Sequence, residues 1–214
     1  MCHNDFIQMI PRAGKRRHAL RLVFLCLAVC LSAFFFSSCA DSAGQTAKGE
    51  QIPLPEVEFE TKQVSLNGFS FAIPADWQEV ENTTGTPATI YAPADAAPES
   101  GTSSVNIIIE ANADLVYPSA DEAKDAIFAQ VKEQMTNLFP EACNYEFAAA
   151  EVRAGEVLSA KVDSDAEGTL VIRQYYPLID GYVIVITGTD IGDGVNPAID
   201  DVASYMLATL VKEN

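Results

Sequence analysis

The chain has very little histidine, and this scarcity removes several kinds of active site. Its two histidines, His3 and His18, both lie near the N-terminus, so residues 39–214 contain none. Nucleophiles that depend on a histidine base are therefore excluded from that part of the chain. The usual zinc sites need histidine or cysteine ligands, which leaves only carboxylate sites for hard cations. We expect no cofactor and predict that the protein is not an enzyme.

Basic residues are few as well. Five of the 13 Lys and Arg residues, but one of the 30 Asp and Glu residues, lie within residues 1–38. Residues 39–214 therefore carry 8 basic and 29 acidic side chains, a net charge of −21. A surface this acidic repels phosphates and anionic lipid headgroups. It excludes nucleic-acid binding and argues against attachment to a membrane through a basic patch.

The longest apolar run, Leu22 to Phe36, is too short to span a membrane. It has 15 residues, whereas a helix that crosses a bilayer needs about 20. Arg and Lys residues between positions 12 and 21 precede the run, and the small residues Ser37 and Ser38 follow it. This order is typical of a signal peptide. Translation from either Met1 or Met9 would leave a sufficient basic segment before the apolar run.

The end of this segment, Phe36-Ser-Ser-Cys39, resembles the lipobox of bacterial lipoproteins, in which Leu usually stands where Phe36 is found. The resemblance implies cleavage before Cys39 and a diacylglycerol on its thiol, and more than one acyl chain is needed for durable anchoring. An uncleaved anchor and ordinary secretion are the alternatives. We thus expect a signal peptide (1–38), a flexible tether (39–60) and a globular domain (61–214) on the extracytoplasmic face of the cell membrane.

Cysteine is scarce in the predicted domain. If Cys39 carries a lipid, Cys143 is the one thiol that remains after residue 38, so no internal disulfide forms. We expect Cys143 to be a small buried hydrophobic residue.

Alternating apolar residues predict most of the strands. Asn67-Gly68 between two alternating runs is typical of a hairpin, here over residues 64–73. Further strands are expected at 89–92, at 105–109 and in a strand-rich section from 145 to 189. Within that section, Tyr182–Ile186 is apolar on both sides, as in a strand that is covered on both faces of its sheet.

Two helices are predicted from capping signals and helical spacing. Ser119 and Glu122 make a capping box at the start of the first helix, and Pro140 follows its end. The last helix is expected to begin at Asn196-Pro197, with Asn196 as N-cap. The predicted buried positions are Ile127, Val131, Met135 and Leu138 in the first helix and Ile199, Val202, Ala203, Met206 and Leu210 in the last.

The order of elements resembles the PsbP-like α/β/α sandwich over about residues 62–212. Phe69-Ser-Phe-Ala-Ile-Pro-Ala-Asp-Trp77 is similar to the aromatic opening strand of that family, and Gly181-Tyr-Val-Ile-Val-Ile-Thr187 is similar to its penultimate core strand. The resemblance implies an α+β domain, with an antiparallel sheet and helices on both faces. It implies a binding or assembly role more than catalysis, and it supplies no catalytic residues.

Three features of the sequence are candidate sites. Asp163, Asp165 and Glu167 match the opening of a calcium loop, but Gln174 stands where its bidentate Glu belongs, and an acidic hairpin turn is the alternative. Asp190, Asp193, Asp200 and Asp201 also offer ligands for a cation, although Asp193 could cap the last helix instead. The loop between Asn82 and Ser103 is long enough to carry a binding surface. Of Tyr175 and Tyr176, which point to opposite faces, we expect one to be partly exposed.

These observations favour a non-enzymatic, lipid-anchored domain that binds an envelope protein or stabilises an envelope complex. A small-ligand carrier is the alternative, and it requires an apolar pocket. A surface hydrolase is a further alternative, which requires two carboxylates that face one cleft.

Overall fold

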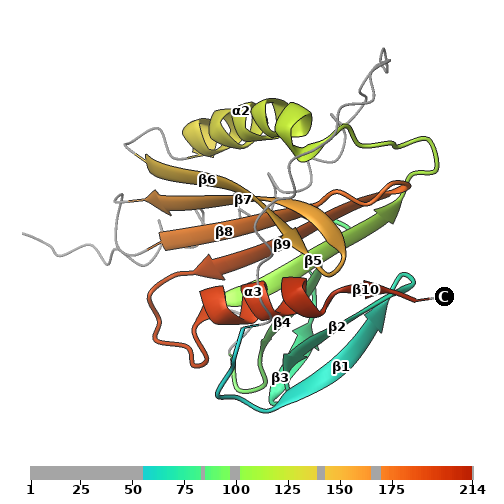
Figure 1. Ribbon diagram of the computed structural model, residues 1–214. Coiled ribbons are helices and arrows are strands. Elements are labelled where there is room, and N and C mark those ends of the chain that lie inside the picture. Colours follow the sequence, from blue (N-terminus) through green and yellow to red (C-terminus); the bar gives the residue numbers. More distant parts are fainter. Residues whose placement is uncertain (1–54, 83–84, 97–101, 139–142, 165–169, 214) are drawn as a thin grey trace, which may run out of the picture.

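The computed structural model describes residues 55–82, 85–96, 102–138, 143–164 and 170–213 (Figure 1). The predicted signal peptide, Cys39 and most of the predicted tether lie outside these ranges. The described residues combine antiparallel sheets with helices, as the sequence predicts. Neither described helix is both long enough and apolar enough to cross a membrane.

The strands form two sheets, where the sequence predicted one. The larger sheet has the order β3-β4-β5-β9-β8-β7-β6, and each pair of neighbouring strands in it is antiparallel. Its strands are β3 (Trp77–Val80), β4 (Thr89–Pro93), β5 (Ser104–Ala111), β6 (Cys143–Val152), β7 (Gly155–Ser164), β8 (Leu170–Pro177) and β9 (Tyr182–Asp190). The smaller sheet has the order β1-β2-β10, with β1 (Thr61–Leu66), β2 (Phe69–Pro74) and β10 (Val211–Lys212).

The hairpin of β1 and β2 confirms the first sequence prediction. Asn67 and Gly68 connect the strands with φ angles of 50° and 79°, as a two-residue hairpin turn of this type requires. The strand β10 joins β2 on its other side, where Val211 lies opposite Ser70. A pair of residues carries no periodicity, so β10 could not be recognised in the sequence.

The first helix, α2 (Ala120–Leu138), lies where the sequence places it. The side chains of Ser119 and Glu122 hydrogen-bond to each other, with Ser119 Oγ 3.3 Å from Glu122 Oε2. The N-terminus also receives a carboxylate from β7, because Ala120 N–H donates to Glu156 Oε2 at 3.3 Å. Ile127, Val131 and Met135 are buried as predicted, whereas the Leu138 and Cys143 side chains and Pro140 lie outside the description.

The predicted start of the last helix is wrong. The helix α3 (Ile199–Thr209) begins two residues later, with Ala198 as N-cap and no side-chain capping bond. The ψ angle of Ala198 is 137°, an extended conformation, so the chain cannot be helical from Pro197 onward. The predicted buried positions are nevertheless correct, including Leu210, which caps the C-terminus of α3.

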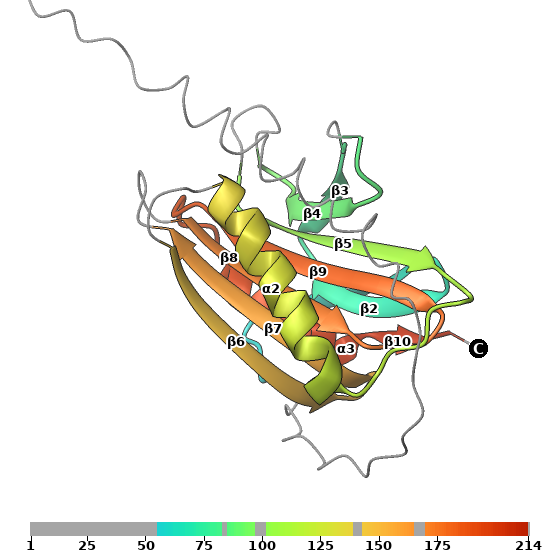
Figure 2. The same cartoon turned by 90° about the horizontal axis from the view of Figure 1, so that it is seen from above.

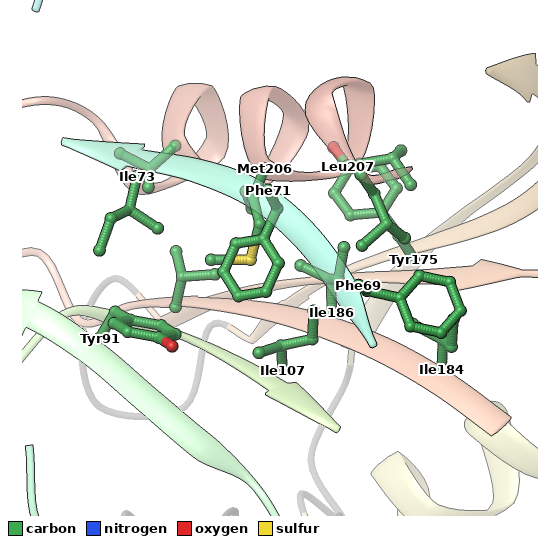
Figure 3. Packing of buried hydrophobic residues seen from close by; sticks show 14 of the residues in the cluster. Phe69, Phe71, Ile73, Tyr91, Ile107, Tyr175, Ile184, Ile186, Met206 and Leu207 are labelled. Carbon is green, nitrogen blue, oxygen red and sulfur yellow. The ribbon is translucent and has the colours of Figure 1, made fainter. Parts of the chain in front are cut away.

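The core is divided between two clusters of side chains. In one, α3 and β2 pack on Ile184 and Ile186 of β9, together with Ile107 of β5 (Figure 3). In the other, α2 lies along β6 and β7 (Figure 2), and its buried side chains cluster with Val183 and Val185 of β9. Successive residues of β9 therefore enter different clusters.

Gly188 of β9 allows α3 to approach the sheet closely. A Cβ at this position would lie 3.0 Å from Ile199 Cγ2 and 3.2 Å from the Ala203 Cβ. These contacts are too close for an additional methyl group, so a larger residue at position 188 would move α3 away from the sheet. The small residues Gly188 and Ala203 therefore set the spacing between the helix and β9.

Candidate functional site

The structure describes one member of the predicted calcium loop. Asp163 lies in β7, where its half-buried carboxylate is 3.9 Å from Lys161 Nζ. Asp165 and Glu167 lie outside the described residues, as does Cys39. Within the ranges that the structure describes, no group of three or more His, Cys, Asp or Glu side chains could hold a metal ion.

The loop after β9 is held to the start of β5 by Asp193. The Asp193 carboxylate accepts hydrogen bonds from Ser103 Oγ at 2.6 Å, from Ser103 N–H at 2.8 Å and from Thr102 Oγ1 at 3.2 Å. Ser103 Oγ in turn accepts a bond from Ile191 N–H at 3.0 Å, and Asp190 accepts one from Gly192 N–H at 2.8 Å. We call Ser103, Asp190 and Asp193 the Ser103 network.

The charge of Asp193 is stabilised by this network. Partial burial disfavours the charged form, but the hydrogen bonds from Ser103, Thr102 and Val195 outweigh it and lower the pKa of Asp193 below its ordinary value of 3.8. The carboxylate therefore stays ionised at neutral pH. Because it binds the start of β5, Asp193 does not cap α3, which was one of the sequence-based alternatives.

Asp200 has a different partner from Asp190 and Asp193. Arg173 of β8 holds it in a bidentate pair, with Nε donating to Oδ1 at 2.9 Å and Nη2 to Oδ2 at 3.0 Å. Partial burial opposes the charge of Arg173, but this pair raises its pKa above the ordinary value. Three of the four acids that the sequence suggested as one cation site are therefore divided between two separate interactions, and the fourth, Asp201, lies in the first turn of α3.

A row of buried polar side chains crosses three strands of the larger sheet. Asn106 of β5 lies opposite Thr187 of β9, and Thr187 lies opposite Gln174 of β8. Gln174 Nε2 donates to Thr187 Oγ1 at 3.4 Å, and Gln174 Oε1 accepts a bond from Tyr176 Oη at 2.8 Å. One end of this buried polar row is therefore internally hydrogen-bonded.

The other end of the row is not hydrogen-bonded. Asn106 is fully buried, yet neither its amide oxygen nor its amide nitrogen has a partner among the described residues. The next cross-strand pair, Ser104 and Thr189, also has two buried hydroxyls without partners. Burying such groups costs free energy. Sequence reasoning missed them because Asn106 alternates with the apolar residues Val105 and Ile107, a pattern that is typical of an exposed position.

Tyr175 and Tyr176 enter different core clusters, as their adjacent positions in β8 predict. The expectation that one of them would be partly exposed is wrong, since both are buried. Burial is also the main cause that raises the pKa of Tyr175 to about 12. Neither tyrosine is available to a partner at the surface.

An aromatic surface lies where α2 meets the outermost strand, β6. Phe128 of α2 stacks on Phe147 of β6 with ring centroids 4.4 Å apart, and Tyr145 also stacks with Phe147, at 5.9 Å. Lys132 Nζ lies 5.9 Å from the centre of the Tyr145 ring. We call Phe128, Lys132, Tyr145 and Phe147 the aromatic edge. It combines residues of a helix and a strand, so no local pattern in the sequence indicated it.

The aromatic edge is partly open to solvent. Phe147 is 36% exposed, and Val116 is the other large hydrophobic side chain that is exposed among the described residues. Phe128 and Tyr145 are half-buried. An exposed ring that already stacks on two others offers an ordered apolar contact to a partner.

Comparisons with known proteins show the fold. No family model matches the chain, and no curated protein matches its sequence. The solved structure of cyanobacterial PsbP from Synechocystis is similar, with a TM-score of 0.50 and 9% sequence identity over 80% of this chain and 98% of that one. This likeness supports a PsbP-like fold and, at so low an identity, nothing about function.

Two further solved structures were found. One is a protein from Bacteroides thetaiotaomicron, with a TM-score of 0.45 and 18% identity over 69% of this chain and 46% of that one. The other is a protein of unknown function from Pseudomonas aeruginosa, with a TM-score of 0.37 and 14% identity over 72% of this chain and 98% of that one.

The Ser103 network is expected to stabilise the fold in a pH-dependent way. Asp193→Asn should lower the free energy of unfolding by about 1 kcal/mol at neutral pH, whereas Asp114→Asn, at an exposed acid, should change it by less than about 0.5 kcal/mol. The folded-state pKa of Asp193 is lowered, so its contribution is complete above the ordinary value of 3.8 and is lost as the pH falls through the lower folded value. Urea unfolding at a series of pH values measures this. An effect of Asp193→Asn that stays constant down to about pH 2 would contradict it.

For the end of the buried polar row that lacks hydrogen bonds, we predict that a substitution does not destabilise the fold. Asn106→Val should leave stability unchanged or raise it by about 1 kcal/mol, because it removes two buried groups that lack partners. Gln174→Leu, in the same row, should lower stability by about 1–3 kcal/mol, because it removes the buried hydrogen bonds that Gln174 makes with Thr187 and Tyr176. Thermal and urea unfolding compare the two. Strong destabilisation by Asn106→Val would mean that the Asn106 amide has a bound partner.

Proposed function

We propose that this protein is a lipid-anchored, extracytoplasmic domain that binds another protein of the cell envelope and has no catalytic activity. The signal-like N-terminal sequence ending at Cys39 supports the anchor and the location. The aromatic edge supports protein binding, and it is the observation on which the proposal depends. An exposed, pre-stacked aromatic group on an otherwise acidic surface fits the composition of binding surfaces, in which aromatic residues are enriched.

We also infer that the fold is the PsbP-like α/β/α sandwich, with α2 on one face of the larger sheet and α3 on the other. Side chains of successive residues in a strand point to opposite faces. Val183 and Val185 cluster with α2, whereas Ile184 and Ile186 cluster with α3. This alternation supports one helix on each face.

Two observations favour protein binding over the alternatives. The hydrolase would need a carboxylic acid that holds a proton near neutral pH, whereas Asp193 has a lowered pKa and stays ionised. The carrier would need an apolar cavity, whereas the core side chains Phe69, Phe71 and Met206, which are labelled in Figure 3, are 0% exposed. A cavity large enough for a ligand would give its lining residues measurable accessible surface.

The anchor is tested by replacing the modified residue. Wild-type protein should partition into the detergent phase of Triton X-114, and its N-terminal peptide should carry the mass of a diacylglycerol on Cys39. Cys39→Ser should lose that mass and remain unprocessed, while Cys143→Ser should behave as the wild type. Finding unmodified Cys39 in the native protein, with residues 1–38 still attached, would contradict the proposal.

Protein binding is tested by two matched substitutions of exposed apolar residues. Cross-linking in intact cells, followed by affinity purification of the full-length protein, should recover a specific partner. Phe147→Ser should reduce that recovery about ten-fold, as expected for the loss of a central aromatic contact. Val116→Ser, at an exposed residue of the loop before α2 that is not part of the aromatic edge, should leave it unchanged. Equal recovery with both variants would reject the aromatic edge as the binding surface.

A further inference from the structure

The strand β6 is the outer edge of the larger sheet along its whole length. It pairs with β7 over ten residues, from Cys143 opposite Ser164 to Val152 opposite Gly155. No described strand pairs with its other side. Backbone N–H and C=O groups that point outward from such an edge form a template on which another strand can pair.

This edge lacks most of the features that usually prevent pairing, and the charged side chains in its sequence are the two acids Glu146 and Glu151. Proteins protect exposed edges with short strands, prolines, bulges and, most often, lysines. The sequence of β6, Cys-Asn-Tyr-Glu-Phe-Ala-Ala-Ala-Glu-Val, contains no proline, lysine, arginine or glycine. Its middle, Ala148 to Ala150, presents small side chains that leave the backbone accessible, and Ala148 and Ala149 are exposed.

The other described edges differ from β6 in this respect. At the opposite edge of the larger sheet, β3 has only four residues. In the smaller sheet, β1 carries Lys62 and the two-residue strand β10 carries Lys212. Among the described strands, β6 is therefore the one long edge without a positively charged residue.

The side chains of β6 specify what kind of strand would fit. Tyr145, Phe147, Ala149 and Glu151 lie on the side that faces α2, since Tyr145 and Phe147 contact α2 residues and strand side chains alternate. Phe147 offers an apolar contact at its exposed ring. Glu151 lies directly opposite Glu156 of β7, and like charges placed in this way repel each other.

Glu151 forms no ion pair with a described residue. None of the three ion pairs there includes Glu151 or Glu156, and Glu156 is used at the N-terminus of α2. A basic side chain on an added strand, placed beside Glu151, would relieve the repulsion between the two carboxylates. Phe147 and Glu151 are four residues apart on one side of β6, so their contacts on the added strand are also four residues apart.

We propose that β6 accepts an extended segment of another protein as an eighth strand, with an apolar side chain on Phe147 and a lysine or arginine beside Glu151, four residues apart. The proposal rests on the protein-binding function and names its mode and the chemistry of the partner. A second copy of this chain is disfavoured as the occupant, because residues 39–214 carry a net charge of −21. A basic segment is attracted by the same charge.

The test uses full-length protein purified in detergent and a fluorescent nine-residue peptide, Thr-Lys-Thr-Val-Thr-Phe-Thr-Val-Thr, with its Lys and Phe four residues apart. Fluorescence anisotropy should detect binding below about 1 mM, the range of weak complexes. Replacing the Phe of the peptide by Ser, or its Lys by Glu, should weaken binding about five-fold, as expected for cross-strand pairs. Failure of the parent peptide to bind would overturn the proposal.

Backbone methylation of the peptide distinguishes strand pairing from simple surface contact. In an added strand, alternate N–H groups point toward the edge. N-methylation at every second residue should therefore abolish binding in one peptide, while methylation of the other alternate set should leave it within about two-fold, since only one set makes hydrogen bonds to β6. Equal effects of the two methylated peptides would overturn the proposal.

Charge reversal tests the register. Glu151→Lys should reverse the preference, so that the peptide with Glu in place of Lys binds about five-fold more tightly than the parent. Glu133→Lys, at an exposed acid of α2, serves as the control and should keep the original preference. If Glu151→Lys fails to fold, Glu151→Gln should remove the preference for Lys. An unchanged preference in the folded Glu151 variant would overturn the assigned register.

The outcomes separate this inference from the function on which it rests. If Phe147→Ser abolishes partner recovery in cells but the methylated peptides behave alike, the protein binds a partner through side chains and the added strand is rejected. If both Phe147→Ser and Val116→Ser leave recovery unchanged, the proposed surface itself is rejected.

Discussion

The strand β9 is the element to which the rest of the molecule is fitted. Four of its residues, Val183 to Ile186, enter the two core clusters alternately, so one pair of β9 side chains joins the cluster of α2 and the other pair joins the cluster of α3. A shift of one residue in its pairing would exchange the two sets. Gly188 then sets the distance between α3 and the sheet, because side chains of the helix leave no room for a Cβ at this position. The register of β9 and the position of α3 are therefore determined together.

The two ends of β9 differ in chemistry. Beyond Ile186 the strand continues with Thr187, Gly188 and Thr189, and the facing residues of β5 are Asn106 and Ser104. At this polar end, Asp193 binds the backbone and hydroxyl of Ser103. The chain thus leaves the apolar core through a hydrogen-bonded segment before it enters α3. The hydrogen bonds of Asp193 therefore fix the loop between β9 and α3. The helix α3 itself has no side-chain cap at its N-terminus.

Local signals predicted the parts of the fold that local physics determines. The turn at Asn67-Gly68 needs two positive φ angles, and α2 has regular apolar spacing, so both could be recognised in the sequence. The start of α3 could not be recognised in the sequence. Asp193 binds Ser103, and the N-cap is Ala198, which has no capping side chain, rather than Asn196. The strand β3 was missed because it has only four residues and lies shortly after Pro74, and its strand conformation depends on pairing with β4.

Contacts between distant residues account for what sequence reasoning missed in the candidate sites. Ser103 and Asp193 are 90 positions apart, and nothing in either neighbourhood indicates that they meet. Phe128 and Phe147 come from a helix and a strand whose packing had to be known first. The charge pattern misled in the opposite way, because neighbouring acids suggested one cation site. The fold instead gives Asp200 to Arg173 and Asp193 to Ser103.

The acidity of the chain and its exposed β6 edge are consistent with each other. A long edge without lysine or proline would favour pairing between copies of the same protein. Two copies that approach edge to edge bring their acidic surfaces within about 8 Å, the distance over which charges act at physiological salt. Repulsion between acidic surfaces therefore prevents two copies from pairing, as lysines on the edge would otherwise do. It does not prevent a basic segment of another protein from pairing with β6. A tether to the membrane, as proposed, would concentrate the copies and make this repulsion more necessary.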